Sequence, residues 1–132
     1  MRKIKTLPLP VEPAQEPEES WRVIDIPIWK GKLFIYVGPY EKFFDRLLEG
    51  GWSKEAVDEL RKERPYDENN EALTVNIKGS GQIAIWSEEP ISKQTLVHEL
   101  CHAVHMLFRS RECEDEEAFC YTLEYLWKEA TK

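Results

Sequence analysis

The sequence predicts a single α+β domain, in which an antiparallel sheet of hairpins packs on two C-terminal helices. Three observations support this fold class. The chain of 132 residues is the size of one domain. Apolar and polar residues alternate in two pairs of short segments, as in strands, and after Ser92 the apolar residues instead recur at helical spacing.

The first 20 residues are expected to form a flexible tail rich in Pro and Glu. Between Thr6 and Ser20 there are four Pro and five Glu or Gln. This composition buries too little apolar surface to offset the entropy of ordering. The folded domain is therefore expected over residues 21–132.

Two hairpins are expected to form the sheet. In the first, residues 24–28 and 33–37 alternate on either side of the turn at Lys30-Gly31. In the second, residues 73–78 and 82–86 alternate around a Gly-rich turn.

Four helices are expected around these hairpins, each with a recognisable start or stop. Pro suits a first helical turn, Ser is a good N-cap, and acids favour the first turn of a helix. The expected helices run from Pro39 to Gly50, from Ser53 to Pro65, from Ser92 to about Arg109, and from about Cys113 to Lys128.

Charge and cysteine content limit the classes of partner and compartment. Acids outnumber bases 25 to 18, for a net charge of −7, whereas proteins that bind nucleic acid concentrate Lys and Arg on one face. No run of about 18 apolar residues offers a membrane span. The three cysteines cannot all pair within one chain, which favours a reducing compartment. We expect a cytoplasmic protein that binds neither nucleic acid nor membrane.

The long helix carries the segment His98-Glu99-Leu100-Cys101-His102. Residues four apart project from one face of a helix, so the two imidazoles can converge on one metal ion. Glu99 lies to the side of that pair, where its carboxylate can act as general base on a metal-bound water. The spacing therefore predicts a Zn²⁺ site with His98 and His102 as ligands and Glu99 as the catalytic residue. The alternative is that the two histidines lie on one face of the helix by chance, with their hydrogen bonds satisfied and no metal bound.

A hydrolytic zinc ion commonly takes three protein ligands and a water, so a third donor is needed. The last helix begins with Glu114, Asp115, Glu116 and Glu117. We prefer Glu117, because the small residue Cys120 lies three positions later on the same face and would allow the two helices to approach. The other acids are better explained as favourable charges at a helix N-terminus, although Glu114 and Glu116 remain alternative ligands.

These two segments resemble the minimal gluzincins, compact zincins in which HExxH is followed by a helix bearing a Glu with a small residue three places on. The match comprises the motif from His98 to His102 and then the segment from Glu117 to Tyr121, and the resemblance covers roughly residues 81–127. The chain is also similar to short metallopeptidase-like proteins common in phage and mobile elements. Cys120 stands where family members usually have Ala.

The resemblance implies a small zincin-like domain, in which the sheet packs on an HExxH helix and a following C-terminal ligand helix. It also implies that one strand of the hairpin at residues 73–86 forms an exposed edge beside the metal, where a protein or peptide substrate could add as a further strand. The expected activity is that of a zinc metallopeptidase. The alternatives are a non-catalytic binding module stabilised by zinc, and a zinc hydrolase of a non-peptide amide. His105 is too far along the helix from His98 to share its metal.

Overall fold

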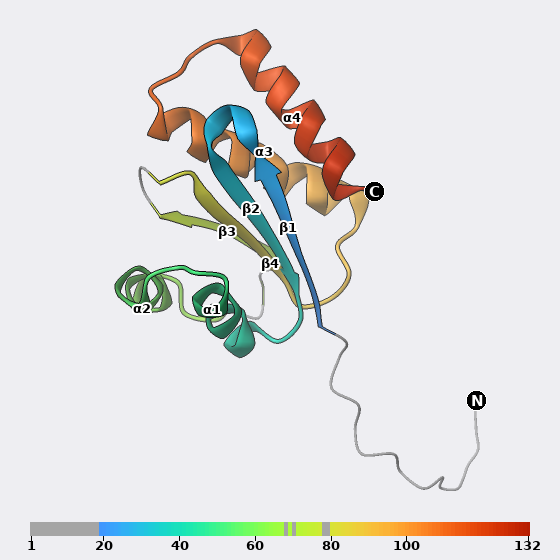
Figure 1. Ribbon diagram of the computed structural model, residues 1–132. Helices are drawn as coiled ribbons and strands as arrows, with labels where there is room; N and C mark the ends of the chain where they lie inside the picture. The colour runs from blue at the N-terminus through green and yellow to red at the C-terminus, as the bar shows by residue number, and fades with distance from the viewer. Residues whose placement is uncertain (1–18, 68, 70, 78–79) are drawn as a thin grey trace, which may run out of the picture.

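The computed structural model describes residues 19–67, 69, 71–77 and 80–132, which form a mixed sheet between two pairs of helices (Figure 1). The elements in chain order are β1 (Ser20–Ile26), the short 3-10 helix η1 (Pro27–Trp29), β2 (Gly31–Val37), α1 (Tyr40–Glu49), α2 (Lys54–Glu63), β3 (Ala72–Ile77), β4 (Gln82–Ser87), α3 (Lys93–Ser110) and α4 (Glu116–Ala130). The expected α+β class is confirmed. Of the expected tail, residues 1–18 lie outside the described residues, whereas Ser20 already belongs to β1.

Both expected hairpins are present, but the sheet is not wholly antiparallel. The strand order is β1-β2-β4-β3, and the central pair β2 and β4 runs parallel, from Lys32 opposite Gln82 to Val37 opposite Ser87. The expected antiparallel sheet is therefore wrong at its centre. Helices α1 and α2 connect the two hairpins across one face of the sheet, and a crossover of this kind allows parallel pairing. Helices cover both faces, so most of β4 is buried.

The start of the parallel pair depends on a close approach between two glycines. The amide of Lys32 donates to the carbonyl oxygen of Gly81 at 3.1 Å. A Cβ atom on Gly31 would lie 2.5 Å from that same oxygen, and Gly81 has a positive φ of 75°. Glycine is therefore favoured at the two positions for different reasons. At Gly31 there is no space for a side chain, and at Gly81 the backbone has a positive φ.

The first hairpin also differs in its connection. Residues 24–28 were expected to be one strand, but β1 ends at Ile26 and Ile28 is 85% exposed in η1. Pro27 explains the early end, because it lacks an N–H and starts the 3-10 turn.

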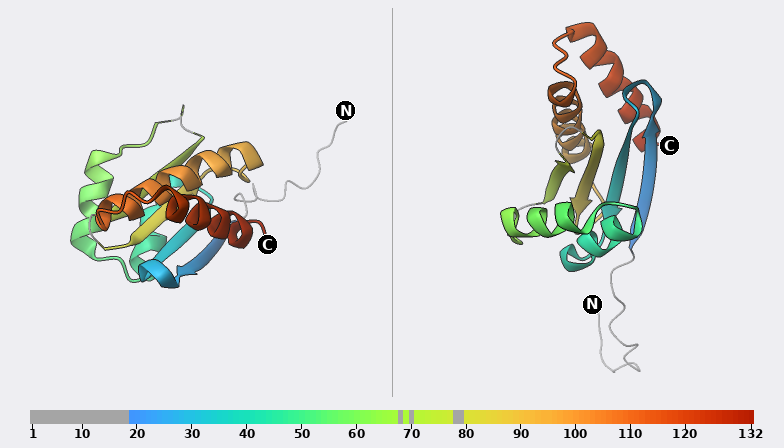
Figure 2. Two further views of the ribbon diagram at one scale, coloured as in Figure 1. Left: turned by 90° about the horizontal axis from the view of Figure 1, so that it is seen from above. Right: turned by 60° about the vertical axis from the view of Figure 1, so that its left-hand side comes forward.

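The two faces of the sheet carry separate hydrophobic clusters. Figure 2 shows the two pairs of helices, α1 with α2 and α3 with α4, on opposite sides of the strands. One cluster joins the sheet to α3 and α4 and includes Ile83, Ile85 and Leu100. The other joins the sheet to α1 and α2 and includes Phe43 and Trp86. Since α3 is held against the sheet by a continuous apolar core, its remaining faces are fixed in direction.

The helix starts follow their N-caps. Ser92 Oγ accepts from the amide of Thr95 at 3.1 Å, which confirms the expected start of α3. The expected start of the last helix at Cys113 is wrong, because the amide of Cys113 donates to Phe108 at the end of α3 and so belongs to the turn. Asp115 caps α4 instead, and its Oδ1 accepts from Ala118 at 3.2 Å. Among the described helices, none is both long enough and apolar enough to cross a membrane.

Candidate metal centre

The motif lies in the middle of α3, on the side that the sheet leaves open. Leu100, Ala103 and Val104 are buried against the sheet, whereas His98 and His102 are exposed. The periodicity of the helix explains this division, because the positions that pack on the sheet recur every three or four residues and leave the two histidines on another face. The sequence motif therefore places two imidazoles together at the protein surface.

The two imidazoles are in direct contact. Nε2 of His98 and Nε2 of His102 lie 3.2 Å apart, and the ring planes are nearly perpendicular at 82°. At the usual zinc–nitrogen distance of about 2.0–2.1 Å, this separation corresponds to an angle of about 100–106° at the metal, close to tetrahedral. Two neutral imidazoles whose Nε2 atoms face each other need a proton or a cation between them. The pair therefore fits a metal ion bound through both Nε2 atoms.

Glu99 completes the cluster from a buried position. Its residue is only 7% exposed, and its Oε2 lies 3.9 Å from Nε2 of His98. The ligand atoms of His98, Glu99 and His102 all lie within 4.8 Å of one another. The structure thus brings together the predicted base and two of the three predicted metal ligands.

The other oxygen of Glu99 is held by a residue that the sequence reasoning missed. Thr74 on β3 donates from its hydroxyl to Glu99 Oε1 at 2.6 Å, and its own exposure is 5%. The alternation of β3 was a usable signal, because Thr74 falls on the face opposite to Leu73 and Val75. That face is covered by α3, so a polar residue on it needs a partner.

The third predicted ligand, Glu117, is not a member of the cluster found among the described residues. It lies in the first turn of α4, and its side chain is exposed. The packing reason for preferring it is wrong, because Cys120 is exposed. The residue that packs on α3 is instead Phe119, whose ring centroid lies 4.8 Å from that of His105.

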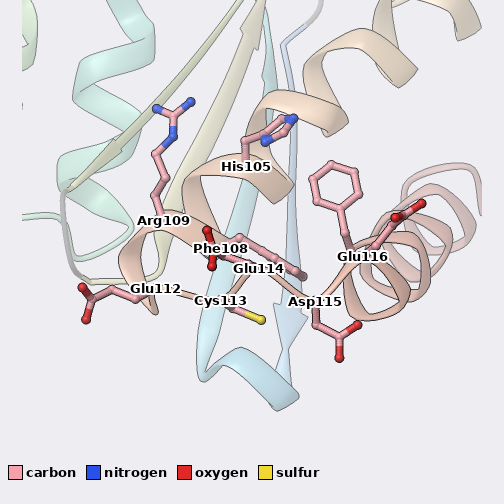
Figure 3. Close-up of a pocket in the computed structure, with 9 residues that line it drawn as sticks. His105, Phe108, Arg109, Glu112, Cys113, Glu114, Asp115 and Glu116 are labelled. Carbon is pink, nitrogen blue, oxygen red and sulfur yellow. The ribbon is translucent and has the colours of Figure 1, made fainter.

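The alternative acids Glu114 and Glu116 surround a different cavity, of about 840 Å³, at the C-terminal end of α3. Figure 3 shows His105 and Arg109 projecting from α3 beside this cavity, with Glu116 on the α4 side. The cavity is not lined by the two histidines of the motif or by Glu99. His105 is thus separate from the metal centre, as its position along the helix indicates.

A second cavity, of about 590 Å³, adjoins His98 and Glu99 of the candidate metal centre. It lies between the N-terminal part of α3 and the start of β3. Its lining is mostly polar and consists of Asn69, Glu71, Ala72, Ser92, Gln94, Thr95, His98 and Glu99. A molecule in this cavity would reach both a predicted ligand and the predicted base.

Comparison with known proteins gives neither a family nor a function for this chain. The resemblance to gluzincins therefore stays a prediction from the motif residues. No family model, no curated protein and no solved structure matches the chain.

Proposed function

We propose that this protein is a zinc-dependent metallopeptidase with a gluzincin-like arrangement of its site. The observation that carries the proposal is the cluster on α3, in which a buried carboxylate lies beside two exposed imidazoles whose Nε2 atoms are 3.2 Å apart. Structural zinc sites are normally closed by four protein ligands and need no base. Here His98 and His102 are exposed, which leaves room for a water and a substrate.

The residues divide the work of hydrolysis. His98 and His102 hold the metal, which when bound supplies a Lewis acid and an acidified water. Glu99 would accept a proton from the attacking water through Oε2, the oxygen that lies 3.9 Å from Nε2 of His98. Glu99 then returns the proton to the leaving nitrogen, so that water adds across the amide bond and the carboxylate is regenerated.

Glu117 is the proposed third ligand, from the first turn of α4. Its exposed side chain is free of a core contact that would hold it away from the histidines. The alternative ligands are Glu114 and Glu116, although both line the cavity beside His105 and not the cavity that reaches His98 and Glu99.

The proposed substrate is a peptide or protein segment that adds to β3. This strand ends the sheet order β1-β2-β4-β3, and α3 with its metal centre lies against it. Extended peptides bind such edges through main-chain hydrogen bonds. The cavity of about 590 Å³ begins where β3 begins, at Ala72, and extends to His98, so a chain along this edge would pass the reacting groups.

Metal analysis of purified variants tests the ligands. We expect one zinc per chain in the wild type and in Glu99→Gln, and loss of zinc in His98→Ala and His102→Ala. Glu117→Ala is compared with Glu116→Ala, which makes the same change one position away in the same turn. Zinc retained by Glu117→Ala but lost by Glu116→Ala would transfer the third-ligand role to Glu116.

Turnover is tested on a fluorescence-quenched peptide library with the zinc-loaded protein. We expect cleavage by the wild type and a loss of at least about 100-fold in Glu99→Gln, as for the removal of a general base. Full zinc occupancy without any cleavage that depends on Glu99 would refute the peptidase proposal. That result would leave a zinc-stabilised binding module or a hydrolase of other amides.

A further inference from the structure

We infer that Thr74 is a positioning residue that holds the carboxylate of Glu99 so that one oxygen stays directed at the histidine pair. The inference rests on the proposed function, in which Glu99 is the base. It concerns a different element of the fold, because Thr74 lies on β3 whereas the whole HExxH motif lies on α3.

The hydrogen bond is directed to the side chain of Glu99. Thr74 Oγ1 lies 2.6 Å from Oε1 of Glu99 and 3.4 Å from its backbone carbonyl oxygen. A hydroxyl carries a single proton, and short contacts of this length are typical of an O–H group donating to a carboxylate. The carboxylate therefore receives the proton, and the carbonyl lies at the margin of hydrogen-bond distance.

The bond divides the two oxygens of Glu99. Oε1 is occupied by Thr74, whereas Oε2 lies 3.9 Å from Nε2 of His98. Rotation of the terminal carboxylate would exchange the two oxygens and requires the Thr74 bond to break. The hydroxyl thus selects the orientation in which a free oxygen lies next to the metal ligands.

Burial and backbone position make this restraint effective. Thr74 and Glu99 are only 5% and 7% exposed, so water competes little for the same oxygen. Thr74 lies opposite Ile85 on the central strand β4, and Ile85 is fully buried. The donor is therefore fixed by the sheet and not by a mobile loop.

A purely structural role would look different in an experiment. If Thr74 only satisfied a buried carboxylate, its loss would lower stability without changing the chemical step. If it positions the base, its loss lowers kcat while KM and zinc affinity stay nearly unchanged, because the substitution removes neither a proposed metal ligand nor a residue that lines the cavity.

The test compares Thr74→Val, which removes the hydroxyl, with Thr74→Ser, which keeps it. Thr122→Val is the matched control, because Thr122 is also buried at 7% exposed, and within the described part of the chain its hydroxyl bonds to Ala118 of α4 and to Trp29. We expect Thr74→Val to lower kcat by about 10–100-fold, the range for a misplaced catalytic group, with KM and the zinc Kd within about 2-fold. Thr74→Ser should recover kcat to within about 3-fold, and Thr122→Val should leave kcat unchanged.

A double-mutant cycle in metal-free protein tests the contact without any activity. Thr74→Val should raise the unfolding equilibrium constant by about 10-fold or more in the wild type, and by clearly less in a Glu99→Ala background. Equal effects in the two backgrounds would overturn the inference even if the protein is an active peptidase. So would a Thr74→Val variant with wild-type kcat.

The two proposals fail separately. If the zinc-loaded wild type has no turnover that depends on Glu99, the peptidase function is refuted, and the cycle still decides whether Thr74 holds Glu99. If turnover exists but Thr74→Val matches the wild type, the function stands and the positioning role does not.

Discussion

Removal of His98 should separate metal binding from folding. Its side chain is 68% exposed, so it contributes little to the core. Surface substitutions of this kind usually change the free energy of unfolding by less than about 0.5 kcal/mol. We therefore expect metal-free His98→Ala to unfold at nearly the same temperature as the metal-free wild type.

With zinc the two proteins should differ strongly. A ligand that binds only the folded state stabilises it by about 2.7 kcal/mol when its free concentration is 100 times Kd. For a domain of this size, each kcal/mol of stabilisation raises the unfolding temperature by about 4 °C. Zinc should therefore raise the unfolding temperature of the wild type by about 10 °C. His98→Ala should lose most of this rise, because His102 and the proposed ligand Glu117 would hold the ion much more weakly than three ligands do.

The assay is thermal unfolding followed by circular dichroism, with and without zinc buffered at a known free concentration. His105→Ala is the matched control, since His105 is also an exposed histidine of α3 but lies outside the cluster. It should keep the full zinc-dependent rise. An equal rise in His98→Ala and the wild type, or its loss in His105→Ala, would refute the assignment of the metal to the motif.

Three further predictions concern the scaffold. Gly31→Ala should lower the free energy of unfolding by about 1–3 kcal/mol in urea titrations, because the new Cβ would lie 2.5 Å from the carbonyl oxygen of Gly81; no change would mean that β2 and β4 can separate without cost. Leu100→Ala should cost about 2–5 kcal/mol in the same assay, since Leu100 is 0% exposed, and a loss below about 1 kcal/mol would contradict its place in the core. A hydrogen bond from Arg46 lowers the pKa of Glu19 below its ordinary value of 4.5. The contribution of Glu19 to the free energy of unfolding should therefore be present above pH 4.5 and be lost as the pH falls through the lower pKa of the folded state. The difference in urea midpoint between the wild type and Glu19→Gln should accordingly shrink below pH 4.5, and a difference that grows there would contradict this sign.

The elements that could be predicted from the sequence are those with local causes. Ser53 and Ser92 cap their helices as expected, since an N-cap acts within its own helical turn. The contact between His98 and His102 is equally local, because a spacing of four on a helix puts both side chains on one face whatever lies around it.

Two of the mispredicted features depend on partners that are distant in the sequence. The parallel pairing of β2 with β4 joins strands separated by two helices, and alternation within a strand does not identify its neighbour. The exposure of Cys120 also depends on how distant elements pack. A small residue at a given spacing indicates which residues share a face of α4, but the packing of α4 on the core, through Phe119 and Leu126 among others, decides which face turns inward.

By itself, then, the sequence determined a helix with two imidazoles and a carboxylate at metal-binding spacing, because helix geometry relates residues four apart without reference to the rest of the chain. Only the tertiary structure decided that Glu99 is buried and that its Oε1 is held by Thr74 on another element. The physical reason is that burial and hydrogen bonding depend on which surfaces meet, and Thr74 and Glu99 meet only after the sheet and α3 have packed together.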